Sequence, residues 1–303
     1  MALTLAHLSD VHLGPLPESA AWKDFALKRV IGTLSWKLKR HKLHDPAIAE
    51  AIVKDIKAAA PDHVAFTGDL LNVSAHAEFL RAADWMENFG DPQWISFVPG
   101  NHDAYVPVKW GQGLGHLAPY MTGDMAVPST QLTSIFPYVR LRRNLAVIGL
   151  NSAAPQSLTS ASGSVGLEQL QTLSKLLPDL KAKGYYRAVM IHHPPIPGLA
   201  PSRKALSDAA YLRDVLRDGG AELVLHGHNH HPIVTVLEGS EGKIPIVGVP
   251  SASMNGDSHY EPAAWNLYEI TRNQGKWATQ VSVRSWDPQL HQIIDKNQFM
   301  LPS

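Results

Sequence analysis

Apolar residues are grouped in short runs that alternate with longer stretches of helical spacing over most of the chain. The short runs predict strands at 3–8, 64–67, 94–98, 187–191 and 223–225. The longer stretches predict helices at 46–60, 75–89, 166–183 and 208–217. Two runs that flank Arg142, Arg143 and Asn144 predict a hairpin at 138–141 and 145–150. After Pro232 the pattern predicts strands alone, at 233–237, 244–249, 266–270 and 277–283.

This order of elements predicts an α/β protein, a four-layer α/β/β/α sandwich in which two mixed β-sheets are flanked by helices. We expect residues 1–303 to form a single domain, because α/β chains of this length often fold as one unit. Two segments interrupt the pattern: a helical insertion at about 18–44, and a segment at about 104–134 that is rich in Gly, Pro and Met. Long irregular segments are more often functional than accidental, so we expect 104–134 to act as a lid.

Polar residues follow one predicted strand after another, at the point where each strand ends. They are Asp10 and His12; Asp69; Asn101, His102 and Asp103; His192 and His193; and His228 and His230. Ligand sites in α/β sheets lie beyond the carboxyl ends of the strands, so these side chains are expected to meet at one edge. Each motif alone is a weak signal, but five of them in order favour a functional site over coincidence.

The composition narrows the chemistry of such a site. The chain has 16 His and no Cys, which excludes disulfides, thiolate metal sites and cysteine nucleophiles. Lys and Arg equal Asp and Glu at 27 each, which argues against broad nucleic-acid binding. No window is long and apolar enough to span a membrane, and the first residues lack the pattern of a signal peptide. We therefore expect a soluble, cytoplasmic protein.

The ordered motifs resemble those of the calcineurin-like binuclear metallophosphoesterase superfamily, over roughly residues 3–285. The motifs that carry the resemblance are Asp10-Val11-His12, Gly68-Asp69, Gly100-Asn101-His102-Asp103, His192-His193 and Gly227-His228-Asn229-His230. Within the superfamily the chain is most similar to bacterial stand-alone phosphodiesterases, a group that includes class III cyclic-nucleotide phosphodiesterases and glycerophosphodiesterases.

The resemblance implies two metal ions, with Mn, Fe and Zn as the metals that suit carboxylate and imidazole ligands. One ion would be held by Asp10, His12, Asp69 and His230, and the other by Asp69, Asn101, His192 and His228. Asp69 would bridge the two ions, and a hydroxide between them would be the nucleophile. His102 would contact the phosphoryl oxygen or protonate the leaving alkoxide. We expect Asp103 to hydrogen-bond the His102 ring and fix its tautomer.

Departures from neighbouring branches make two other assignments unlikely. Protein Ser/Thr phosphatases of the superfamily carry an Arg where this chain has Pro99, and an acidic-Arg-Gly sequence where it has Leu70-Leu71-Asn72-Val73. Lipid A pathway pyrophosphatases carry Arg at the position of His102.

Other residues near these motifs have both structural and functional interpretations. His7, His63 and His226 are expected in the core, and His231 is expected to be structural or exposed. Extra contacts to the site are less favoured alternatives for His193, His259, Asn72 and Tyr105.

Residues 22–42 form a separate feature in which basic and apolar residues are interleaved. Seven of the 27 basic residues lie here against one acid, Asp24. The apolar residues at helical spacing are Leu27, Val30, Ile31, Leu34 and Leu38, and the basic ones are Lys23, Lys28, Arg29, Lys37, Lys39, Arg40 and Lys42. The pattern predicts an amphipathic helix that packs on the domain and leaves its basic face solvated. Peripheral contact with anionic membrane lipid and a basic lip over an anionic substrate are the two alternatives.

We therefore predict an enzyme that hydrolyses a small organic phosphodiester. A phosphomonoesterase on the same two-metal core is the main alternative, since one sequence does not separate the two. A nuclease is disfavoured by the balanced charge and by the lack of an extra DNA-binding domain. A non-catalytic scaffold is disfavoured because such proteins lose metal ligands that this chain retains. The predicted partner is a small phosphoester, and the oligomeric state is left open.

Overall fold

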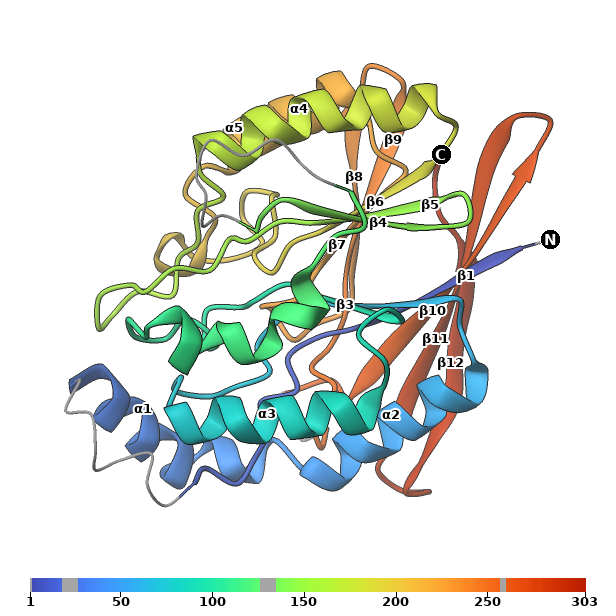
Figure 1. Cartoon of the computed structure of the whole chain (residues 1–303). Coiled ribbons are helices and arrows are strands. Elements are labelled where there is room, and N and C mark those ends of the chain that lie inside the picture. The colour runs from blue at the N-terminus through green and yellow to red at the C-terminus, as the bar shows by residue number, and fades with distance from the viewer. Residues whose placement is uncertain (1, 18–26, 126–134, 257–259) are drawn as a thin grey trace.

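Two six-stranded mixed sheets form the centre of the computed structural model, which describes residues 2–17, 27–125, 135–256 and 260–303 (Figure 1). In spatial order the first sheet contains β12 (Gln292–Met300), β11 (Lys276–Asp287), β10 (Ala264–Asn273), β1 (Leu3–Leu8), β2 (His63–Phe66) and β3 (Ile95–Phe97). The second contains β4 (Tyr138–Arg142), β5 (Leu145–Gly149), β6 (Tyr186–Met190), β7 (Leu223–His226), β9 (Gly242–Gly248) and β8 (Ile233–Gly239). β1, β2 and β3 are parallel, as are β5, β6, β7 and β9.

Helices cover the outer face of each sheet (Figure 1). The first sheet is covered by α2 (Pro46–Ala59) and α3 (His76–Phe89), and the second by α4 (Leu167–Ala182) and α5 (Ala209–Gly219). α2 begins as its sequence predicts, with Pro46 in the first turn and the Asp45 side chain accepting a hydrogen bond from the Ala47 N–H. The predicted α/β/β/α sandwich is confirmed.

The core lies between the two sheets and continues under the helices. Phe66, Phe97 and Trp265 of the first sheet pack in one buried cluster with Tyr186 and Met190 of the second. A second cluster lies between the second sheet and helices α4 and α5. Buried side chains therefore hold both sheets in place, and with them the ends of their parallel strands.

The C-terminal hairpin is longer than the sequence predicts. β11 extends to Asp287, and β12 follows it where we predict no strand. β12 is an edge strand whose residues are mostly exposed or half-buried, so it lacks the alternation of apolar and polar residues that marks a strand.

The segment at 104–134 is more regular in its described part than the sequence predicts. It contains two 3₁₀ helices, η3 (Trp110–Gln112) and η4 (Leu114–Met121), and η4 packs against α3 and β3. Leu117, Tyr120 and Met121 are buried in the core between the sheets. The described part is therefore packed on the domain. The role of 104–134 as a lid stays a prediction, and 126–134 lie outside the described residues.

Candidate functional site

The predicted ligands lie at the carboxyl ends of parallel strands, where the backbone turns sharply. Five of them, Asp10, His12, Asp69, His228 and His230, have left-handed φ angles between 47° and 71°. Such angles are unfavourable for residues with a Cβ, and they cluster at functional sites. The turns also need glycine at fixed positions: a Cβ on Gly100 would clash with the Asp69 carboxylate. The backbone therefore aims these side chains at one place.

One group of side chains surrounds the end of β1. His230 Nε2 lies 3.1 Å from Asp10 Oδ1 and 3.3 Å from His12 Nε2. His12 Nε2 lies 3.9 Å from Asp10 Oδ1 and 3.8 Å from Asp69 Oδ2. Donor atoms that share one ion lie about 3–4 Å apart, because each is about 2.0–2.2 Å from it. This group could hold one metal ion.

A second group continues from the same oxygen of Asp69. His192 Nε2 lies 3.5 Å from Asp69 Oδ2 and 3.2 Å from Asn101 Oδ1. His228 Nδ1 lies 2.8 Å from Asn101 Oδ1 and 3.3 Å from His192 Nε2. The structure thus brings all seven predicted ligands together, with Asp69 between the two groups.

In two of the predicted ligand histidines, a hydrogen bond from Nδ1–H to a backbone carbonyl directs Nε2 toward the site. The Nδ1–H of His12 donates to the Leu71 carbonyl at 3.1 Å, and that of His192 donates to the Thr67 carbonyl at 2.7 Å. Nε2 of each ring is then the nitrogen that offers its lone pair to a metal ion, once any proton on it has left. Burial, Arg40 and His44 lower the pKa of His12 well below its usual value, so its imidazole is neutral.

The charges at Asp69 also suit a cation. Burial opposes ionisation of Asp69, but the His192, His102 and His12 imidazoles hold its pKa well below the usual value. Burial lowers the pKa of His192, but Asp69 outweighs it and raises that pKa to about 9. A positive charge is therefore stabilised beside the Asp69 carboxylate, and a metal ion would supply it in place of a proton. The residues present fit a pair of divalent ions.

His102 lies on the cavity side of the metal ligands. Its Nδ1–H donates to the Asn72 carbonyl at 2.6 Å, and its ring stacks on Tyr105 with centroids 5.3 Å apart. Nε2 is thus the ring nitrogen left for a substrate. Burial and Arg40 lower the pKa of His102 to about 3, so the ring is neutral in this state.

Asp103 does not contact the His102 ring as predicted. Its Oδ2 accepts hydrogen bonds from the backbone N–H groups of Asp69 and Gly100, and its Oδ1 accepts one from Leu71. The prediction is wrong because Asp103 turns back under two loops whose N–H groups need an acceptor. Asp103 positions the loops that carry Asp69 and Asn101, and the Asn72 carbonyl takes the role of orienting His102.

Comparison with known proteins agrees with this geometry. The family model described as calcineurin-like phosphoesterase matches residues 3–232. The chain belongs to the calcineurin-like phosphoesterase family. It is therefore a metal-dependent phosphoesterase, as the ordered motifs indicate.

One sequence relative and two solved structures are similar to this phosphoesterase over nearly all of its length. A Synechococcus protein named probable cyclic nucleotide phosphodiesterase is 25% identical over 284 residues, which cover 93% of this chain and 92% of that protein. A dimetal phosphatase from Danio rerio has the same fold, with a TM-score of 0.63 and 13% identity over 99% of this chain and 98% of that one. Purple acid phosphatase PPD1 from yellow lupin (Lupinus luteus) seeds matches with a TM-score of 0.59 and 12% identity, over 100% of this chain and 54% of its own.

Two side chains of the inserted segment reach the predicted metal ligands of the phosphoesterase. Neither was predicted as a site residue, although Arg40 belongs to the basic segment for which a lip over an anionic substrate was one alternative. Arg40 belongs to the short η2 (Arg40–Lys42) that follows α1 (Leu27–Leu38), and His44 lies between η2 and α2. Arg40 Nη2 lies 2.9 Å from His12 Nδ1, and Arg40 Nη1 lies 3.3 Å from His102 Nδ1. Arg40 Nη2 also lies 3.3 Å from His12 Nε2. The guanidinium therefore lies against the first ligand group, beside His102, and lines the same cavity as the His102 ring.

His44 is the second of these side chains. One of its ring nitrogens lies within 4.8 Å of the ligand atoms of His12 and His230. Its Nδ1 lies 2.8 Å from Ser253 Oγ, and its ring stacks on Trp36. His44 could therefore bind the same ion as His12. The only signal in the sequence is its position just before the α2 cap, which by itself points to no metal.

Four of the predicted metal ligands line a cavity of about 490 Å³: Asp69, Asn101, His228 and His230. Four cationic side chains line it: Lys28, Arg40, Arg203 and Lys204. Arg203 and Lys204 come from η5 (Ser202–Lys204), which the sequence did not mark as part of a site. Among the described lining residues, the only acid is Asp69. The cavity therefore favours an anionic ligand of small-molecule size.

The other residues near the motifs, for which the sequence allowed both structural and functional interpretations, fall into three sets. His7, His63 and His226 are buried in strands, as predicted for core residues. His193 is buried, with its ring between Ser152 and the Ala161 carbonyl, and His231 is exposed. Asn72 is buried and holds Leu13 and His102, Tyr105 lines the cavity, and His259 lies outside the described residues.

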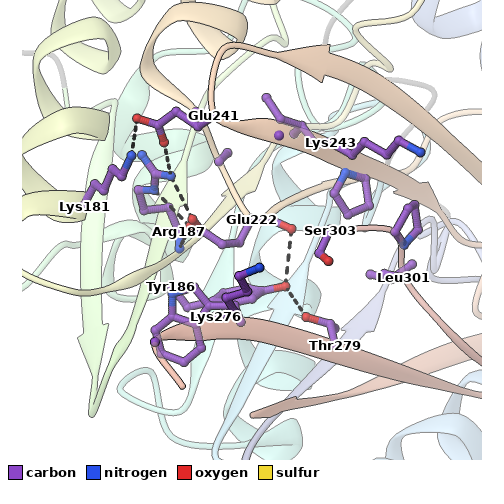
Figure 2. Close-up of a pocket in the computed structure, with 18 residues that line it drawn as sticks. Lys181, Tyr186, Arg187, Glu222, Glu241, Lys243, Lys276, Thr279, Leu301 and Ser303 are labelled. Carbon is purple, nitrogen blue, oxygen red and sulfur yellow. Dashed lines mark hydrogen bonds and ion pairs between the residues drawn. The ribbon is translucent and has the colours of Figure 1, made fainter. Parts of the chain in front are cut away.

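A second cavity, of about 370 Å³, lies at the opposite ends of the strands (Figure 2). Four of its charged groups are paired with one another: Arg187 contacts Glu222 at 2.8 Å and Glu241 at 3.2 Å, and Lys181 also contacts Glu241. Tyr186 and Thr279 are hydrogen-bonded through their hydroxyl groups. These pairs join the second sheet to its neighbours, and they indicate a structural role.

Proposed function

We propose that this phosphoesterase hydrolyses a small organic phosphodiester with the help of two divalent metal ions. The observation that carries the proposal is the meeting of both ligand groups and His102 in one cavity of about 490 Å³. The name of the 25% identical relative makes a cyclic nucleotide one candidate substrate.

The proposed metal ligands are the two groups that share Asp69. Asp10, His12 and His230 would complete one site, and Asn101, His192 and His228 the other. When bound, two such ions lower the pKa of a water molecule toward neutrality and offset the charge of a transferring phosphoryl group. Mn, Fe and Zn all suit these ligands.

The chain's own side chains would act on the substrate. Arg40 would donate charge-assisted hydrogen bonds to a non-bridging phosphoryl oxygen. His102, held through Nδ1 by the Asn72 carbonyl, would present Nε2 to the phosphoryl group or the leaving oxygen. Because the ring is neutral in the free enzyme, a role as acid needs a proton taken up after the anionic substrate binds.

A phosphomonoesterase is the second candidate. The four cationic side chains that line the cavity would also neutralise the second negative charge of a monoester. The same metal ligands serve both reactions.

A substrate panel on the metal-reconstituted enzyme tests the proposal. We expect bis(p-nitrophenyl) phosphate to be hydrolysed faster than p-nitrophenyl phosphate, and the panel extends to cyclic nucleotides and glycerophosphodiesters. The His102→Ala variant, assayed with the same metals, controls for hydrolysis by free ions. Turnover of the monoester alone would overturn the phosphodiesterase assignment and favour the second candidate.

A further inference from the structure

Helix α1 is oriented with its apolar side toward solvent. Its buried residues are Arg29, Gly32, Thr33 and Trp36. Arg29 donates to the carbonyls of Val73 and Ser74, and Trp36 stacks on His44. The expectation that the apolar face packs on the domain is therefore wrong, because the opposite face of the helix is anchored instead.

The outward face forms a continuous aliphatic stripe. Its five residues are each 43–63% exposed: Leu27, Val30, Ile31, Leu34 and Leu38. They recur at spacings of three and four residues, so they cover about 100° of the helix surface. Scattered exposed aliphatic residues are ordinary, but five on one face mark an interaction surface. α1 lies at the outer end of the helical layer (Figure 1).

The charge around the stripe is of one sign. Residues 27–44 contain six basic residues and no acidic one. Lys37, Lys39 and Lys42 of this group flank the stripe or follow it in the next turn. An aliphatic face bordered by lysines is the pattern of helices that lie in the interface of an anionic membrane. No helix in the described part of the chain could cross a bilayer.

We propose that α1 docks this protein on the surface of a membrane that contains anionic phospholipid. The stripe enters the boundary between headgroups and acyl chains, and the lysines contact the phosphates. A second copy of the chain fits the face less well, because stacking two such helices would bring like charges together.

Docking would also orient the active site. Lys28, Gly32 and Ser35 of the same helix line the catalytic cavity, next to the half-exposed Leu158. The mouth of the cavity would therefore lie close to the membrane surface.

Vesicle flotation of the full, metal-loaded chain tests this proposal. We expect binding to vesicles of phosphatidylcholine mixed with phosphatidylglycerol, weaker binding to phosphatidylcholine alone, and weakening by salt. Ile31→Ser with Leu34→Ser should reduce the bound fraction at least about tenfold, because it removes aliphatic burial. Lys37→Glu with Lys39→Glu should reduce it on the anionic vesicles. Leu167→Ser is the matched control, since Leu167 is 66% exposed on α4, and it should change nothing.

Three results would overturn the proposal. They are failure of the wild type to float with anionic vesicles, equal binding by the Ile31/Leu34 variant, and a dimer in solution that this variant converts to a monomer. The last result would assign the stripe to a second copy. Circular dichroism and metal content verify that the variants fold, and the charge-reversal pair provides a second test if the Ser pair does not. Hydrolysis of a soluble diester should be unchanged in all of them, so failure here is separable from failure of the proposed function.

Discussion

The candidate site is built from two regions that differ in how they are held. The metal-ligand edge consists of loops that follow the parallel strands of the two buried sheets, so its residues are placed by the core. The inserted segment at 27–44 lies outside both sheets and is anchored through Trp36, Arg29 and the His44–Ser253 hydrogen bond. The first region supplies a general metal centre. The second adds Arg40, His44 and an exposed apolar face, which we propose adapt that centre to a particular substrate and location.

We expect the largest loss of activity and of bound metal when Asp69 is replaced. Asp69→Asn should abolish activity and lower metal content more than His12→Ala or His192→Ala, because Asp69 Oδ2 adjoins both ligand groups. Plasma mass spectrometry on the three purified variants measures this difference. Equal metal content in all three would show that Asp69 does not bridge.

At the same edge, we expect substitution of His102 to slow the chemical step without affecting metal binding. His102→Ala should retain its metals and lose about 10²–10⁴-fold in kcat, the usual contribution of general acid–base catalysis. If the residue acts as an acid, the loss should shrink for leaving groups of low pKa, whereas electrostatic stabilisation predicts a uniform loss. Loss of the metals in this variant would instead make His102 a ligand or a structural support.

We expect the inserted segment to strengthen metal binding at the site of Asp10, His12 and His230 through His44. His44→Ala should weaken binding of one equivalent of metal by about 10–100-fold, the effect typical of residues that support a metal site. Isothermal titration of the apo-protein with Mn²⁺ measures the two affinities. His41→Ala is the control, because His41 is exposed in the same turn. Unchanged affinity in His44→Ala would confine the metal centre to the strand ends.

The smallest effect concerns Arg40, which is expected to bind substrate without binding metal. Arg40→Ala should raise KM for an anionic diester by about tenfold, as expected for loss of a charge-assisted hydrogen bond. Arg40→Lys should restore part of the loss, because it returns the charge without the planar fork. Steady-state kinetics at saturating Mn²⁺ distinguishes KM from kcat, and Lys39→Ala serves as the exposed neighbour. An unaltered KM would remove Arg40 from the site.

The two regions also differ in how far the sequence predicts them. The order of strands places Asp10, Asp69 and His192 at one edge, because parallel strands end on the same side of a sheet. That argument depends only on the order and direction of the strands. The structure brings those residues together, as the argument predicts. Asp103 was misassigned because adjacency in sequence does not determine whether a carboxylate reaches a ring or the backbone of a loop.

No comparable rule predicts how the inserted segment is oriented on the domain. Helical spacing predicts that α1 has an apolar face but does not say which way that face points. Burial of Trp36 and Arg29 decides its orientation, and both depend on contacts with distant residues, among them Val73 and Ser74. β12 was missed for a related reason, since an exposed edge strand need not alternate.

Electron paramagnetic resonance of the wild-type protein during Mn²⁺ titration tests the central claim most directly. The account predicts that two equivalents bind, and that the second converts the six-line signal of an isolated ion into the broadened spectrum of a spin-coupled pair, because one carboxylate lies between the two sites. A six-line signal that persists at every loading, or saturation at one equivalent, would contradict a two-metal centre joined by Asp69.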